Sequence, residues 1–122
     1  MGKVYNRAKM SITSVDGGTG ELTLNAAEAG YQTFTASGAA NNETLSYVIE
    51  DGDAWEYGEG IYTATGTKLT RVVTKSSDGA GTQLTLTGSA VVFMALRSED
   101  FYITPETLTH TSGAISIDLA GG

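Results

Sequence analysis

This chain of 122 residues contains short segments in which apolar and polar residues alternate, separated by glycine-rich turns. This feature constrains its fold more than any other. Leu45, Tyr47 and Ile49 occupy every second position, a spacing that places them on one face of a β-strand. Further short β-type runs lie at residues 10–12, 22–24, 61–63, 69–75 and 83–87, with turn-like segments at 16–20, 51–53, 65–67 and 77–81. The turn at 51–53 interrupts an alternation that resumes after it, which predicts a β-hairpin there. Regularly spaced short strands joined by glycine turns predict an all-β fold, a small antiparallel β-sandwich or barrel.

Three other segments show a different pattern. Residues 90–96 form the most continuous apolar run, whose length suits a strand buried on both faces, although a short buried helix fits the same pattern. Residues 24–29 look helix-like and end at Gly30, a good position for a helix C-cap. Residues 104–107 could form one helical turn, with Pro105 at its first position. Both helical windows are too short to be secure, so the expected class stays all-β.

Composition excludes several classes of function. The chain has no cysteine, so it can form no disulfide and offers no thiolate to a metal or a substrate. Its net charge of −7 argues against nucleic acid and against anionic lipid as partners. No apolar run approaches the length that spans a bilayer, and no apolar signal region follows the N-terminal basic residues. We therefore expect a protein made in a cytoplasm, without a membrane partner.

The chain divides into a predicted β-sandwich domain, residues 1–98, and an extended C-terminal β tail, residues 99–122. In the tail, Ile115, Ile117 and Leu119 alternate along one apolar edge. An exposed strand of this kind is prone to pair with another chain. The tail could fold back on the main sheet or meet the tails of sister chains. We favour the second, which makes these three residues the predicted oligomer interface.

Two groups of residues suggest chemistry without reaching a motif. Asp51, Asp53, Glu56 and Glu59 form an acidic cluster, but the spacing of a calcium-binding EF-hand is missing. Glu56 and Glu59 could serve as glycosidase carboxylates, although acidic hairpin tips are usually solvated. His110, the single histidine, lies in a threonine-rich stretch without a nucleophile-elbow pattern. We expect no catalytic residue, no metal and no cofactor.

Aromatic residues gather in the centre of the chain. Trp55 and Tyr57 should share one face of a strand, and Tyr62 follows closely. Core packing is the first interpretation for Trp55, whereas Tyr57 and Tyr62 are candidates for an interface, where such side chains are enriched. We take all three as candidate surface-interaction residues. In an adhesin, exposed Trp55 or Tyr57 would stack on a sugar.

The central segment, residues 47–63, resembles a module of tailed-bacteriophage and prophage virion structural proteins, often found near the start of tail-fibre or head-fibre proteins. Its pattern is an extended strand, a Glu-Asp-Gly turn at 50–52, a Trp-Glu pair at 55–56, a Gly-x-Gly at 58–60 and a Tyr-Thr step at 62–63. Flanking matches lie at residues 30–34, 69–71 and 92–96. The resemblance covers roughly residues 10–96.

This resemblance implies a non-enzymatic virion protein that anchors a fibre or decorates the head or tail. It implies a homo-oligomer, often a trimer, bound to other phage head, neck or tail proteins, with residues 99–122 opening a fibre shaft. A host-surface glycan is a further conceivable partner. The resemblance transfers no binding residue, and we expect the central glycines to adopt the positive φ of tight turns. The rival functions are a carbohydrate-binding adhesin module and an envelope-degrading hydrolase that uses Glu56 and Glu59.

Overall fold

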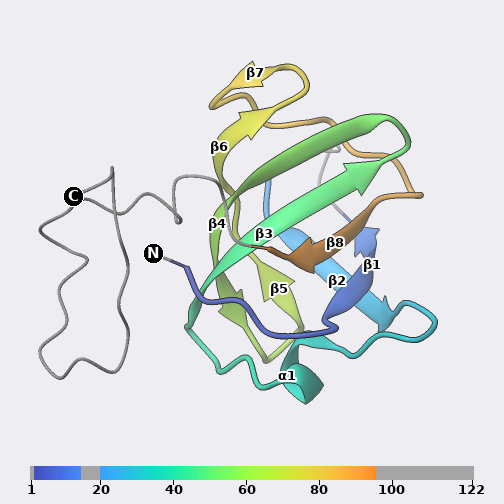
Figure 1. The fold of residues 1–122 in the computed structure, drawn as a ribbon, viewed down its shortest axis with the longest axis vertical. Coiled ribbons are helices and arrows are strands. Elements are labelled where there is room, and N and C mark those ends of the chain that lie inside the picture. Colours follow the sequence, from blue (N-terminus) through green and yellow to red (C-terminus); the bar gives the residue numbers. More distant parts are fainter. Residues whose placement is uncertain (1, 15–19, 96–122) are drawn as a thin grey trace, which may run out of the picture.

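A computed structural model describes residues 2–14 and 20–95 of the chain. Within them, eight strands form one antiparallel sheet, with a single helical turn between the second strand and the third (Figure 1). The elements are β1 (Lys9–Ser14), β2 (Leu22–Ala27), α1 (Phe34–Ser37), β3 (Thr44–Asp51), β4 (Ala54–Thr63), β5 (Lys68–Leu69), β6 (Val72–Ser76), β7 (Gly79–Ala80) and β8 (Val91–Met94). The all-β prediction is confirmed.

The sheet closes on itself. Its strands follow the order β3-β8-β1-β2-β5-β4, and β3 pairs again with β4, so these six strands make a closed barrel. β6 lies along the side of β4 next to β5, and the β6–β7 hairpin extends beyond the barrel (Figure 1). Closure gives each barrel strand a partner on both sides, which removes the open edges that favour aggregation. Of the two predicted architectures, the barrel is the one that forms.

The alternation of apolar residues sorts side chains between the inside and the outside of the barrel. Inner positions of β3 and β8 are buried, whereas Val91 and Phe93 on the outer side of β8 are only half-buried. The prediction of a strand buried on both faces is therefore wrong for residues 90–96 as far as they are described. A small barrel has one packed interior, so each strand has only one fully buried face. The largest fully buried side chains are Tyr47, Tyr62, Phe34, Met10, Leu22, Leu45, Ile49 and Leu69.

A loop closes one end of the barrel. In residues 83–87 alternate side chains are buried, as the sequence pattern suggests, but this segment is not one of the strands. Side chains satisfy its backbone instead, because the Leu84 amide donates to Glu56 at 2.8 Å and the Thr87 amide donates to Asp51 at 2.7 Å. The alternation indicates burial here without strand pairing.

The helical turn α1 lies at the opposite end (Figure 1). Thr33 caps it, accepting a hydrogen bond at 3.0 Å from the Ala36 amide, and Gly38 ends it with a φ of 117°. The helix-like window at residues 24–29 is mostly β2, since pairing with β1 overrides a weak local preference for helix. No helix of the described residues is long and apolar enough to cross a membrane.

Several predictions fall on residues 96–122, outside the described part. They are the boundary after residue 98, the tail strand, the helical turn at 104–107, His110 and the interface residues Ile115, Ile117 and Leu119.

Candidate functional site

The β3–β4 hairpin carries most of the candidate residues, and its prediction from the turn at 51–53 is confirmed. Asp51 pairs with Ala54 across a turn of two residues, in which Gly52 has a φ of 64°. The strand period then places Trp55 and Tyr57 outside the barrel and Glu56 inside. The hairpin thus separates two groups that look like one cluster in the sequence.

Glu56 forms a buried ion pair with Arg71, and both side chains are fully buried. The guanidinium binds the carboxylate through two atoms, Nη2 to Oε1 at 2.6 Å and Nε to Oε2 at 2.9 Å. The Tyr47 hydroxyl donates to Oε2 at 2.8 Å, and the Leu84 amide completes the coordination of Oε1. Burial of the Tyr47 hydroxyl is the largest cause that raises its pKa far above the ordinary range, and the charge of the neighbouring Glu56 carboxylate raises it further. Glu56 therefore belongs to the core and not to a solvated hairpin tip.

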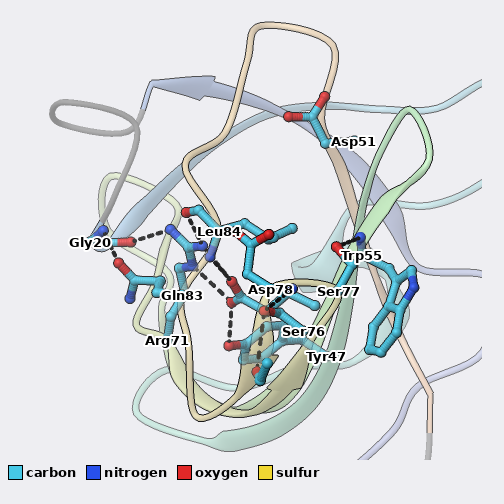
Figure 2. A network of polar contacts seen from close by, with 12 residues as sticks. Gly20, Tyr47, Asp51, Trp55, Arg71, Ser76, Ser77, Asp78, Gln83 and Leu84 are labelled. Carbon is cyan, nitrogen blue, oxygen red and sulfur yellow. Dashed lines mark hydrogen bonds and ion pairs between the residues drawn. The ribbon is translucent and has the colours of Figure 1, made fainter.

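Arg71 also connects the loops at this end of the barrel. Its Nη1 donates to the Gly20 carbonyl at 3.2 Å and its Nη2 donates to the Leu84 carbonyl at 2.9 Å (Figure 2). The Gly20 amide in turn donates to the Gln83 side chain at 2.6 Å. Sequence reasoning missed Arg71. One signal in the sequence could have pointed to such a residue. The strand period places Glu56 inside the barrel, and a buried carboxylate requires a cationic partner.

The predicted acidic cluster is dispersed in the structure. The Asp51 carboxylate accepts bonds from the Thr87 amide at 2.7 Å and the Thr87 hydroxyl at 2.6 Å, which fixes the closing loop. Asp53 is exposed at the turn, and Glu59 lies on the outer side of β4. Within the described ranges, no three His, Cys, Asp or Glu side chains lie so that they could hold a metal ion.

Two of the three predicted surface aromatics lie at the surface. Trp55 is 36% exposed and stacks on half-buried Tyr57, with ring centroids 6.0 Å apart and planes 13° apart. The shared face is confirmed, and the core interpretation of Trp55 is wrong. Tyr62 is 1% exposed, and its hydroxyl lies 2.7 Å from the Thr35 hydroxyl. A surface role for Tyr62 is therefore also wrong, because its position on β4 points inward.

Strand register extends this surface across the barrel. The pairs Lys9–Phe93, Phe93–Val48, Val48–Tyr57 and Tyr57–Lys75 join neighbouring strands, so these five residues form a continuous line, which we call the outer row. Side chains paired in this way lie about 5 Å apart at Cβ. The outer row has an apolar centre and one cation at each end.

A cavity of about 340 Å³ opens at the Lys9 end of the outer row. The Arg7 guanidinium lies 4.0 Å from the centre of the Tyr31 ring. The Lys9 ammonium lies 5.3 Å from the same ring and 5.4 Å from the Phe93 ring. Sequence reasoning missed this cavity, because its walls come from segments that meet only after the barrel has closed.

The site thus combines an exposed aromatic surface, a cationic cavity and a buried ion pair that holds the hairpin in place. No family model, curated protein or solved structure matches the chain. The functional proposal therefore rests on the residues and their geometry.

Proposed function

We propose that this chain is a structural module of a bacteriophage virion, which anchors a fibre or decorates the head or tail and works without catalysis. In this proposal the barrel docks on another virion protein through the outer row and the adjoining Trp55. The observation that best supports this proposal is the stacked Trp55–Tyr57 pair, which lies on the outside of a barrel whose interior is already packed.

The chemistry of the outer row suggests what docks there. Trp and Tyr side chains are frequent anchors of protein interfaces, because they bury a large area and lose few rotamers. Val72 on neighbouring β6, opposite Glu59, is a further exposed apolar side chain, 69% exposed. Lys9 and Lys75 at the ends of the outer row favour a partner segment that is apolar in its centre and acidic at its flanks.

Residues 47–63 supply the link to virions, because this segment resembles the phage module and also forms the hairpin that carries Trp55 and Tyr57. We further propose that the chain is a trimer, held together through Ile115, Ile117 and Leu119 of the tail.

Self-association and docking are tested by separate measurements. Light scattering on the full chain should give a trimer, and Ile117→Asp should give a monomer with an unchanged melting temperature.

Docking is tested by incorporation into phage particles. The double variant Trp55→Ser/Tyr57→Ser should remain a folded trimer but be absent from purified phage particles. Ile61→Ser, which removes another exposed apolar side chain of β4 away from the outer row, is the matched control and should still be incorporated. A monomeric full chain, or normal incorporation of the double variant, would contradict the corresponding half of the proposal.

A further inference from the structure

Two cations converge on the cavity at the Lys9 end of the outer row, although the chain has a net charge of −7. Arg7 and Lys9 both lie over the Tyr31 ring. In the part of the chain that the structure describes, neither is joined to a carboxylate by an ion pair. Like charges held close together repel, and an anion placed between them would be attracted to both.

The cavity is held in a fixed shape before any ligand binds. The loop that carries Tyr31 is tied to the residues before β1, because the Gln32 amide donates to the Arg7 carbonyl at 2.6 Å and the Arg7 guanidinium donates to the Gly30 carbonyl at 2.6 Å. Arg7 has a φ of 58°, a conformation uncommon for residues other than glycine. A site ordered in advance loses little freedom on binding, and backbone strain of this kind is concentrated at functional sites.

We propose that this cavity binds an acidic sugar, a six-membered ring that carries one carboxylate. Arg7 and Lys9 supply charged donors for the carboxylate. Phe93, on the outer side of β8, offers apolar surface to the carbons of the ring. The volume of about 340 Å³ is at the lower end for small-ligand sites and suits one or two sugar rings.

Glu50 narrows the choice of ligand. Glu50 also lines the cavity, and a carboxylate can accept hydrogen bonds from hydroxyl groups. The same negative charge repels a second charge on the ligand, which disfavours phosphate relative to a singly charged, hydroxyl-rich ring. The cavity shares Lys9 and Phe93 with the outer row, and binding of the sugar does not depend on docking.

The test is a calorimetric titration of the full chain with galacturonate, a single ring with one carboxylate, compared with neutral galactose and with inorganic phosphate. We expect saturable binding of galacturonate that is at least about ten-fold tighter than binding of either comparison compound. Lys9→Gln and Arg7→Asn should each weaken it about ten-fold or more, because each removes a charged hydrogen bond. Asparagine tolerates the positive φ at position 7. Lys75→Gln, which removes the same charge at the far end of the outer row, is the matched control.

Amide chemical-shift changes at Ala8 and Tyr31 should accompany binding and should require at least about ten-fold more ligand in Lys9→Gln. Several results would overturn the proposal. They are no heat with millimolar galacturonate, an equal loss of affinity in Lys75→Gln, or phosphate binding as tight as that of the sugar. If Arg7→Asn does not fold, Lys9→Gln, judged by its melting curve, carries the test alone.

Discussion

At the scale of single residues, the buried pair of Glu56 and Arg71 connects the wall of the barrel to the loop that closes one end. Its members come from β4 and from the connection between β5 and β6, and their further bonds reach Gly20 and Leu84. Bringing two charges out of water is costly, so such a pair is useful only when its polar atoms are satisfied. Here each carboxylate oxygen of Glu56 accepts two hydrogen bonds. The pair therefore determines where the closing loop lies.

Removing both members of this pair should cost less than the sum of the two single removals. Glu56→Gln or Arg71→Met should each lower the free energy of unfolding by about 3–5 kcal/mol, because the remaining partner stays buried with its polar groups unmatched. In the double variant the loss should be clearly smaller than the sum of the two. Urea denaturation of the four proteins measures this coupling. Additive losses would show that the pair does not act as a unit, and if the single variants do not fold, recovery of folding in the double variant shows the coupling.

At the scale of elements, Gly58 and Gly60 let two strands approach closely. A Cβ at Gly58 would collide with the Val72 carbonyl oxygen, and one at Gly60 would collide with the Thr70 carbonyl oxygen. The pairing of β4 with β6 also shifts its register between Tyr57 and Gly58, a bulge that bends the sheet. The expected positive φ is found at Gly52 in the turn but not at these two positions. Their role is close approach of the backbone.

Alanine at either position should therefore destabilise the barrel. Gly58→Ala and Gly60→Ala should each cost about 1–3 kcal/mol of unfolding free energy, because the obstacle is backbone that cannot rotate away. Gly88→Ala is the matched control, since nothing lies within 4 Å of its added Cβ and its φ is not positive. Thermal denaturation of the three variants compares them. Equal stability of Gly58→Ala and Gly88→Ala would rule out the steric role.

Local pattern predicted the elements better than it predicted the site. The hairpin and the shared face of Trp55 and Tyr57 follow from the strand period and the turn at 51–53, which involve only near neighbours. Tyr62 obeys the same period, and counting positions along β4 from Trp55 would have placed it inside. The outer row and the cavity depend on the register of β1, β8 and β3, which a single sequence does not contain. The ion pair of Glu56 with Arg71 is also a contact between segments distant along the chain, so the local pattern could not predict it.

At the scale of the whole molecule, the N-terminal segment is fastened to the barrel through Glu43. The Tyr5 hydroxyl donates to Glu43 at 2.7 Å, and the Ala40 amide donates to the same oxygen at 3.0 Å. Lys3 forms an ion pair with the other oxygen at 2.9 Å, and its backbone pairs with β3. These contacts, with the Tyr5 hydrogen bond as the largest, lower the pKa of Glu43 to about 2.

The lowered pKa of Glu43 makes stability depend on acid in a defined window. A carboxylate whose pKa is lower in the folded state stabilises the fold at neutral pH and loses that contribution as it becomes protonated. The contribution should be complete above about pH 4.5, the ordinary pKa, and disappear as the pH falls towards about 2. Glu43→Gln should reduce the fall in melting temperature across this window, and Tyr5→Phe should reduce it in part, because the largest cause of the shift is then gone. Melting curves from pH 7 to pH 2 measure it. If Glu43→Gln kept the full slope of the wild type, other carboxylates would carry the acid sensitivity and the N-terminal segment would be held mainly by its backbone pairing with β3.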